Sequence, residues 1–355
     1  MLREIRRTDP TNRRVICFTS LTYAYLARAR VLFESLRKHQ PQWKLIALIT
    51  DQLPNDLEID LAKEPFDELA TSESIIGAKH DHWLFGHDIV AACTAIKGPF
   101  LRRLLDRDDC DLVVYLDPDT CLFRRMDELE DLMSQFAIAL TPHQLVPSVG
   151  RRQIVDDEIG SLRHGIYNLG FLAVSNTEEG RKFARWWEDR LLNFCFDDPE
   201  LGLFVDQRWC DHVPVLFNEV KIIKNPGYNV ASWNIAQRHV AFDDQGFLTA
   251  NNEPLYFCHF TKVGSVGDIM LRRNAGANFQ AQEVWHWYER QLAQRQLFGL
   301  PRGWWKYGTY RNGEPISAED RRIWRSRFDL QDKFENPFDT GPDTYKHWLT
   351  ANASQ

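Results

Sequence analysis

Cysteine pairs, phosphate-binding glycine loops and long apolar runs are all missing from this sequence. Its seven cysteines form no C-x-x-C pair, and most lie in apolar stretches such as VICFT and YFCHF. Disulfide frameworks and zinc sites use closely spaced pairs, so we expect buried, reduced thiols, as in a cytosolic protein. They occupy positions 17, 93, 110, 121, 195, 210 and 258.

The absence of membrane and targeting signals sets the expected location. No stretch approaches the roughly 18 consecutive apolar residues of a transmembrane helix. The opening MLREIRRTDPTNRR is basic but has no apolar core, so we expect no signal peptide. We predict a cytoplasmic protein, with peripheral attachment to the inner face of the membrane as the alternative. The stretch LFGLPRGWWKYGTYR would make that contact, although its Pro and Gly favour a packed structural role.

Several other function classes are disfavoured by what is absent. The net charge is −7 with no long Lys/Arg run, which argues against a nucleic-acid partner because such binding needs a concentrated basic face. The motifs G-x-G-x-x-G, G-x-x-x-x-G-K-[ST] and G-x-S-x-G do not occur, which disfavours dinucleotide oxidoreductases, P-loop enzymes and α/β-hydrolases. His80, His82 and His87, with Asp88, have neither helical-pair nor finger spacing, so we do not predict zinc there.

What is present suits a large α/β protein. Hydrophobic residues make up 44% and charged residues 26% of the chain, enough for a packed core. The first half alternates short apolar runs with helical patterns, which indicates a parallel sheet covered by helices. Predicted strands are 14–20, 44–50, 111–116, 136–141 and 169–174, and predicted helices are 23–39 and 85–106, the latter broken at Gly98-Pro99.

The pattern changes after residue 176. We predict helices at 178–195 and around 203–210, strands at 221–224 and 255–260, and a mostly helical chain after 278. This division gives a catalytic domain over residues 1–276 and a helical C-terminal extension over 277–355.

Two carboxylates follow the apolar strand DLVVYL. Asp117 and Asp119 flank Pro118 directly after that strand, and open α/β sheets bind ligands at the carboxyl ends of their strands. Paired carboxylates suit Mg²⁺ or Mn²⁺ bound partly through substrate phosphates. An ordinary acidic turn remains the alternative interpretation of this motif.

Further segments occur in a fixed order around this motif. They are TAIK with Lys97, GIYNLGFLAV with Asn168 and Gly170, FVDQ with Asp206 and Gln207, NPGYNVASWN with Trp233 and Asn234, and LYFCHF with His259. Their order resembles the retaining glycosyltransferases of family 8, which have the GT-A fold, and even more a group of uncharacterised bacterial sugar transferases. The resemblance spans about residues 14–264. It loosens at Thr261-Lys262-Val263-Gly264, where the family has a Gly and later K-P-W.

The resemblance implies a GT-A fold, with a mixed, mostly parallel sheet flanked by helices, and a role for each matched residue. Asp117, Asp119 and His259 would bind Mn²⁺ or Mg²⁺, and Asp117, Lys97 and Lys262 would contact the nucleotide or its phosphates. The donor-sugar contacts would come from Asn168, Gly170, Asp206, Gln207, Trp233 and Asn234. Structural alternatives stay open for several of them: a solvated helix lysine for Lys97, a helix cap for Asp206, a core histidine for His259 and a packed aromatic for Trp233.

The predicted function is transfer of a sugar from a nucleoside-diphosphate donor, with a UDP-sugar favoured, to a hydroxyl of a glycan, lipid-linked saccharide or protein. Retention of configuration follows from the family resemblance alone. The alternatives are an inverting transferase with Asp206 as base, a sugar-1-phosphate nucleotidyltransferase, and a non-catalytic carbohydrate-binding module. The nucleotidyltransferase is disfavoured because residues 19–30 lack the glycine-rich loop expected there.

Overall fold

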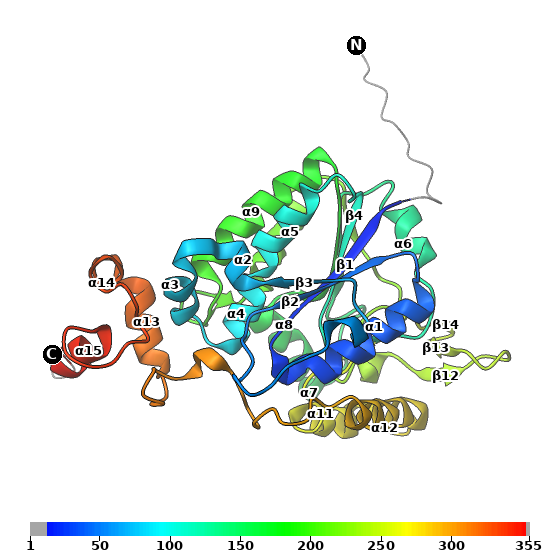
Figure 1. Ribbon diagram of the computed structural model, residues 1–355. Helices are drawn as coiled ribbons and strands as arrows, with labels where there is room; N and C mark the ends of the chain where they lie inside the picture. Colours follow the sequence, from blue (N-terminus) through cyan, green and yellow to red (C-terminus); the bar gives the residue numbers. More distant parts are fainter. Residues whose placement is uncertain (1–12, 353–355) are drawn as a thin grey trace, which may run out of the picture.

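A seven-stranded sheet in the order β10-β6-β7-β4-β1-β2-β3 forms the centre of the protein (Figure 1). This is a computed structural model that describes residues 13–352, so most of the basic N-terminal segment lies outside the described residues. Neighbouring strands pair in parallel except around β7, which is antiparallel to β4 and β6. The predicted α/β fold with a mixed, mostly parallel sheet is therefore confirmed. The strands are β1 (Val15–Leu21), β2 (Lys44–Ile49), β3 (Glu68–Thr71), β4 (Leu112–Leu116), β6 (Ile138–Pro142), β7 (Tyr167–Ser175) and β10 (Val220–Ile222).

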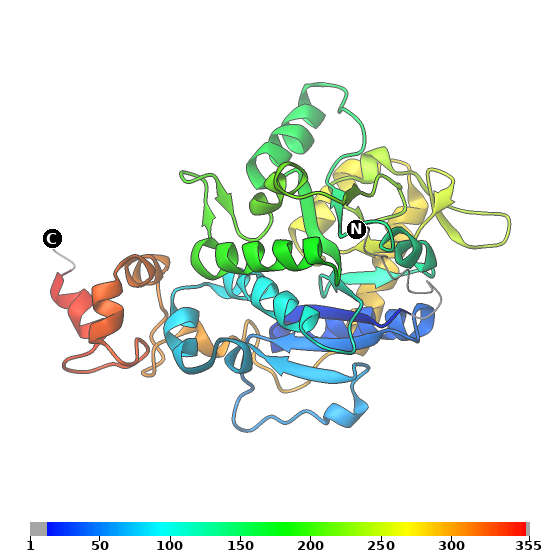
Figure 2. The same ribbon diagram turned by 90° about the horizontal axis from the view of Figure 1, so that it is seen from above.

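Helices cover both faces of this sheet, which explains why the strands read as continuous apolar runs. In β1, Ile16 and Phe18 face a cluster that contains side chains of α5 (Lys97–Leu105) and α9 (Glu178–Phe194). Val15 and Cys17 face the opposite cluster, which contains α1 (Leu26–His39). Figure 2 shows α5 and α9 packed side by side over one face of the sheet.

Two local predictions were wrong. The helical stretch 85–106 does not break at Gly98-Pro99: α4 (Ile89–Ala95) ends before Ile96, and Gly98-Pro99 lie in the first turn of α5. Proline is tolerated there because the first helical N–H groups have no partner within the helix. Gly98 has a packing role instead, since a Cβ on it would lie 2.9 Å from the Cα of Glu188 on α9.

The second error concerns residues 203–210, which are not one helix. Leu203–Phe204 (β9) pair with Asp197–Asp198 (β8), and a 3₁₀ turn over Arg208–His212 follows. The apolar residues here pack by tertiary contact rather than along a helical face.

A second, three-stranded sheet lies beyond the end of β4. It consists of β11 (Val230–Ala231), β15 (Phe257–His259) and β5 (Thr120–Leu122). The register pairs His259 with Thr120 across antiparallel strands. This pairing brings the end of the LYFCHF segment next to the turn that carries Asp117 and Asp119.

The C-terminal part is helical, as predicted. The helices are α11 (Val266–Ala275), α12 (Phe279–Gln294), α13 (Ala318–Ser326), α14 (Phe328–Lys333) and α15 (Tyr345–Asn352). α11 and α12 share a hydrophobic cluster with β15, while α13, α14 and α15 pack around Phe85 and Trp324 at another end of the molecule (Figure 1). The boundary after residue 276 stays a prediction. None of the described helices has the length and apolar character needed to cross a membrane, and all seven cysteines are free thiols.

Asp51, which follows β2, forms a hydrogen bond with the segment that leads to α13. Its Oδ1 accepts hydrogen bonds from the backbone N–H groups of Gln52 and Lys306, both at 2.9 Å. Its Oδ2 is buried without a hydrogen-bond partner. Burial raises the pKa of Asp51 to about 6 from 3.8, against the opposing effect of these amide hydrogen bonds.

This raised pKa predicts a loss of stability with rising pH. Ionisation of Asp51 is harder in the folded than in the unfolded chain, so its favourable contribution is present below about pH 4 and is lost as the pH rises through about 6. Two pKa units correspond to roughly 3 kcal/mol. The Asp51→Asn variant cannot titrate at this position. We therefore expect the free energy of unfolding of wild type, measured with urea, to fall by up to that amount relative to the variant between about pH 4 and about pH 6. A stability difference that does not change with pH would contradict this prediction.

Candidate metal centre and its polar surroundings

Asp117, Asp119 and His259 converge at the carboxyl end of β4. The Nε2 atom of His259 lies 3.1 Å from Oδ1 of Asp119 and 3.6 Å from Oδ2 of Asp117. One potential ligand atom from each of the three residues lies within 4.8 Å of the other two. Two carboxylates and an imidazole at this spacing can hold a divalent cation. Within residues 13–352, this is the one group of three His, Cys, Asp or Glu side chains with that property.

Burial and neighbouring charges shift the pKa values of His259 and Asp119 in opposite directions. Burial alone would lower the pKa of His259, but the carboxylates of Asp119 and Asp117 outweigh it and raise the pKa. Burial would likewise raise the pKa of Asp119, but His259 and Arg28 lower it. His259 and Asp119 therefore each favour the charged form of the other.

Asn229 orients the imidazole. Its Oδ1 lies 3.2 Å from Nδ1 of His259, and its Nδ2 donates to Oδ1 of Asn168 at 2.9 Å and to Oγ1 of Thr141 at 3.0 Å. Because the amide oxygen can only accept, Nδ1 is the protonated ring nitrogen and Nε2 is turned to the carboxylates, as in metal-binding histidines with a fixed tautomer. Asn229 was not among the predicted site residues; its only signal in the sequence was its place in the NPGYNVASWN segment.

Lys97 is buried between two carboxylates. Its Nζ lies 2.9 Å from Oδ2 of Asp206 and 3.3 Å from Oδ1 of Asp117, and 4.1 Å from the centre of the Tyr115 ring. Burial alone would lower the pKa of Lys97, but Asp117 and Asp206 raise it above its ordinary value. Burial also raises the pKa of Asp206, against the effect of Lys97. The lysine is therefore a fixed positive charge at the edge of the metal centre.

Asn168 and Gln207 form a polar network that Asn229 connects to His259. Asn168 donates to Oε1 of Gln207 at 3.2 Å, and its Oδ1 accepts from the N–H of Gly170 at 3.1 Å. Gln207 in turn donates to the carbonyl of His164 at 2.7 Å. Both amides already have partners within the protein, which fixes their orientation next to His259.

The other predicted site residues are Trp233, Asn234 and Lys262. Trp233 packs edge-on against His259, with ring centres 5.1 Å apart. Asn234 is buried and bonds within its own loop, accepting from the N–H of Ala231 and donating to the carbonyl of Asn229. Lys262 follows β15 on an exposed loop, with a left-handed backbone φ of 51°.

Gly170 makes room for the imidazole. A Cβ at this position would lie 2.4 Å from Cε1 and 2.6 Å from Nδ1 of His259. Its carbonyl also accepts from the N–H of Asp117 at 2.9 Å, which ties β7 to the metal-centre turn. The absence of a side chain at residue 170 is therefore required by the His259 ring itself.

Gly170→Ala should displace His259 and weaken metal binding. Disturbing the positioning of a metal ligand typically costs about 10–100-fold in affinity, and overpacking should cost about 1–3 kcal/mol of stability. Mn²⁺ titration followed by electron paramagnetic resonance measures the first effect. Gly160→Ala is the matched control, because a Cβ there meets nothing within 4 Å. Wild-type Mn²⁺ affinity in Gly170→Ala would show that His259 is not a ligand.

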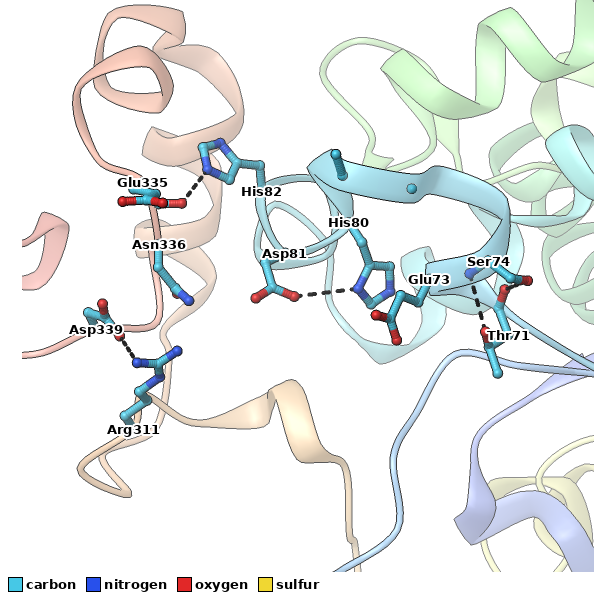
Figure 3. Close-up of a pocket in the computed structure, with 12 residues that line it drawn as sticks. Thr71, Glu73, Ser74, His80, Asp81, His82, Arg311, Glu335, Asn336 and Asp339 are labelled. Atoms are coloured by element: carbon cyan, nitrogen blue, oxygen red, sulfur yellow. Dashed lines mark hydrogen bonds and ion pairs between the residues drawn. The ribbon is translucent and has the colours of Figure 1, made fainter.

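A separate polar cavity of about 1020 Å³ lies between α2 (Ser72–Ile76), α3 (His80–Phe85) and the C-terminal segment (Figure 3). Its charged side chains mostly have partners: Arg311 pairs with Asp339 at 2.7 Å, and His82 contacts the carbonyl of Glu335 at 2.6 Å. His80 faces Asp81 and Ser72. His80 and His82 therefore point to different partners rather than to a common ion.

Comparison with known proteins gives limited similarity. No family model matches the chain. It is 29% identical over 181 residues to the uncharacterized protein YfnF of Bacillus subtilis, covering 50% of this chain and 59% of YfnF. It is 33% identical over 124 residues to human glycogenin-2, covering 33% of this chain but 22% of glycogenin-2.

Solved structures with similar chains include two glycosyltransferases. The glycosyltransferase GlyE of Streptococcus pneumoniae TIGR4 has a TM-score of 0.45 at 18% identity, covering 80% of this chain and 63% of that one. The galactosyltransferase LgtC, in complex with donor and acceptor sugar analogs, has a TM-score of 0.48 at 16% identity, covering 82% of this chain and 98% of that one.

Proposed function

We propose that this chain is a metal-dependent glycosyltransferase of the GT-A fold, similar to family 8. It would transfer a sugar from a nucleoside-diphosphate donor, with a UDP-sugar favoured, to a hydroxyl group. The observation that carries the proposal is the Asp117–Asp119–His259 cluster at the carboxyl end of β4, with its ligand atoms within 4.8 Å of one another. The segment similarity to human glycogenin-2 supports it.

The bound cation, Mn²⁺ or Mg²⁺, would act as a Lewis acid that neutralises charge on the departing diphosphate. Lys97 adds a fixed positive charge at the same edge, because its partners Asp117 and Asp206 hold the ammonium in place. Asn229 keeps His259 in the tautomer that leaves Nε2 free. Asn168, Gln207, Trp233 and Asn234 would contact or support the donor sugar, and Lys262 would approach the phosphates from its loop.

Retention of configuration is the preferred stereochemistry. Same-face attack assisted by the leaving phosphate needs no strong protein base, and the carboxylate of Asp206 is ion-paired with Lys97 at 2.9 Å. The inverting alternative assigns Asp206 as the general base, for which a raised pKa is favourable. The anomeric configuration of the product, read by proton NMR, separates the two.

The acceptor would be a glycan, a lipid-linked saccharide or a protein, and the enzyme would act in the cytoplasm or at the inner face of the membrane. A carbohydrate-binding module is the non-enzymatic alternative. Such a module would bind glycan without nucleotide and would not need Asp119.

Thermal unfolding in the presence of nucleotides tests the proposal. A ligand at about 100 times its Kd stabilises the folded state by about 2.7 kcal/mol, which shifts Tm by a few degrees. We expect one of UDP, GDP, dTDP or CMP to give this shift with Mn²⁺ and to lose it on chelation. No shift with any of them would favour a metal-independent enzyme or a binding module.

A further inference from the structure

Arg28 is a cation whose charge acts on Asp119, but to which the proposed function assigns no ligand. It lies in the first turn of α1, at the end of the loop that follows β1. Its guanidinium stacks on the ring of Tyr25, 4.4 Å from the ring centre. Its Nε is buried and, among the described residues, has no hydrogen-bond partner. A buried N–H of a charged group is costly without an acceptor, so an acceptor from outside the chain is expected.

A second unpaired polar group comes from α12. The Tyr288 ring stacks face to face on Phe260, with centres 3.8 Å apart and planes 4° from parallel. Phe260 directly follows His259, and its N–H donates to the carbonyl of Asp119 at 2.8 Å. The hydroxyl of Tyr288 is buried and also has no partner within residues 13–352.

The two groups come from helices that pack against each other and share a hydrophobic cluster with the strands of the metal centre. Arg30 donates to the carbonyl of Arg295 at 2.8 Å, which fixes the start of α1 against the end of α12, and Figure 1 shows the two helices side by side. Ala27 and Val31, on either side of Arg28 in α1, share a hydrophobic cluster with Cys121, Phe260 and Tyr288.

Lys97 is the second cation of this region. It contacts Asp117 and Asp206, whereas the charge of Arg28 acts on Asp119. Lys97 thus has carboxylate partners, whereas the buried Nε of Arg28 has no partner among the described residues. A guanidinium offers several N–H donors in a planar fork that matches phosphate oxygens.

Resting on the proposed function, we infer that Arg28 binds the diphosphate of the nucleotide donor on the Asp119 side of the metal centre. Tyr25 holds the guanidinium plane by stacking, and the buried Tyr288 hydroxyl leaves a polar position open beside it. A diphosphate carries negative oxygens on two phosphorus atoms, so it offers acceptors to Arg28 as well as to a bound metal ion. The nucleoside part of the donor has no charge for Arg28 to recognise.

Comparing a nucleoside with its diphosphate tests this assignment. Isothermal titration calorimetry with Mn²⁺ would measure UDP and uridine on wild type, Arg28→Ala, Arg28→Lys and the control Arg37→Ala. Arg37 is on the same helix but pairs with Asp67, away from the centre. We expect Arg28→Ala to weaken UDP about 10–100-fold, the equivalent of a lost charged hydrogen bond, and to leave uridine unchanged. Arg28→Lys should recover part of the loss, and Arg37→Ala should match wild type.

The outcomes separate this inference from the proposed function. Equal UDP affinity in wild type and Arg28→Ala, or an equal loss for UDP and uridine, would overturn the inference while leaving a nucleotide-binding enzyme. Failure of wild type to bind UDP, GDP or dTDP would overturn the proposed function and the inference together. If Arg28→Ala does not fold, as judged by circular dichroism, the UDP-to-uridine comparison on Arg28→Lys decides: an unchanged UDP affinity overturns the assignment.

Discussion

Replacing Asp119 with asparagine is expected to abolish metal-dependent nucleotide binding and to lower sugar transfer by on the order of 10³-fold. The buried Asp119 carboxylate lies 3.1 Å from Nε2 of His259, and both are candidate ligands of the same cation. The amide keeps the shape but removes the charge that holds a divalent ion. Lewis-acid stabilisation is worth several kcal/mol, and each 1.36 kcal/mol is tenfold in rate.

Two measurements check this expectation: the nucleotide-induced Tm shift with Mn²⁺, and transfer or donor hydrolysis assayed with UDP-sugars. Asp127→Asn is the matched control, because Asp127 is an exposed aspartate whose ion pair is with Arg125. If Asp119→Asn keeps wild-type glycan binding and the wild type shows no nucleotide response, the chain is a carbohydrate-binding module. If the variant keeps full transfer activity, the metal centre has been misassigned.

Replacing Lys97 with methionine is expected to destabilise the fold by about 3–5 kcal/mol. Removing one partner of a buried ion pair leaves an uncompensated charge, which costs that much in known cases. Lys97 and Asp206 are each 3% exposed and have a second carboxylate, Asp117, beside them. Methionine has a similar length, so lost packing contributes little to the expected change.

A double-mutant cycle separates the ion pair from other effects of the substitution. Asp206→Asn removes the buried charge that Lys97→Met leaves behind, so the double variant should be more stable than the sum of the single changes predicts, by roughly 1–3 kcal/mol. Urea unfolding of the four proteins measures this coupling. Additive free energies would show that Lys97 and Asp206 act independently, which their 2.9 Å separation argues against. Arg102→Met, which removes an exposed contact to Glu188, is the control.

Much of the fold could be predicted because apolar periodicity and strand length are local properties. The predicted strands at 44–50 and 111–116 correspond to β2 (Lys44–Ile49) and β4 (Leu112–Leu116). The errors fell where local rules and tertiary packing disagree. Gly98-Pro99 looked like a helix break, but both residues lie in the first turn of α5, where proline needs no N–H partner within the helix. Gly98, which has no side chain, lets α5 approach α9 closely.

The sequence by itself determined the strand that Asp117 and Asp119 follow, because a buried apolar run followed by a proline-fixed acidic turn is encoded within ten residues. It also supplied His259, Lys97 and Asp206 as an ordered set, but no distances between them. Only the tertiary structure decided that β15 pairs with β5 and places His259 beside Asp119, and that Lys97 lies between Asp117 and Asp206. The positions of Asn229 and Arg28 were likewise evident only from the tertiary structure. Their roles depend on backbone pairing and packing between segments far apart in the chain, and no single segment contains that information.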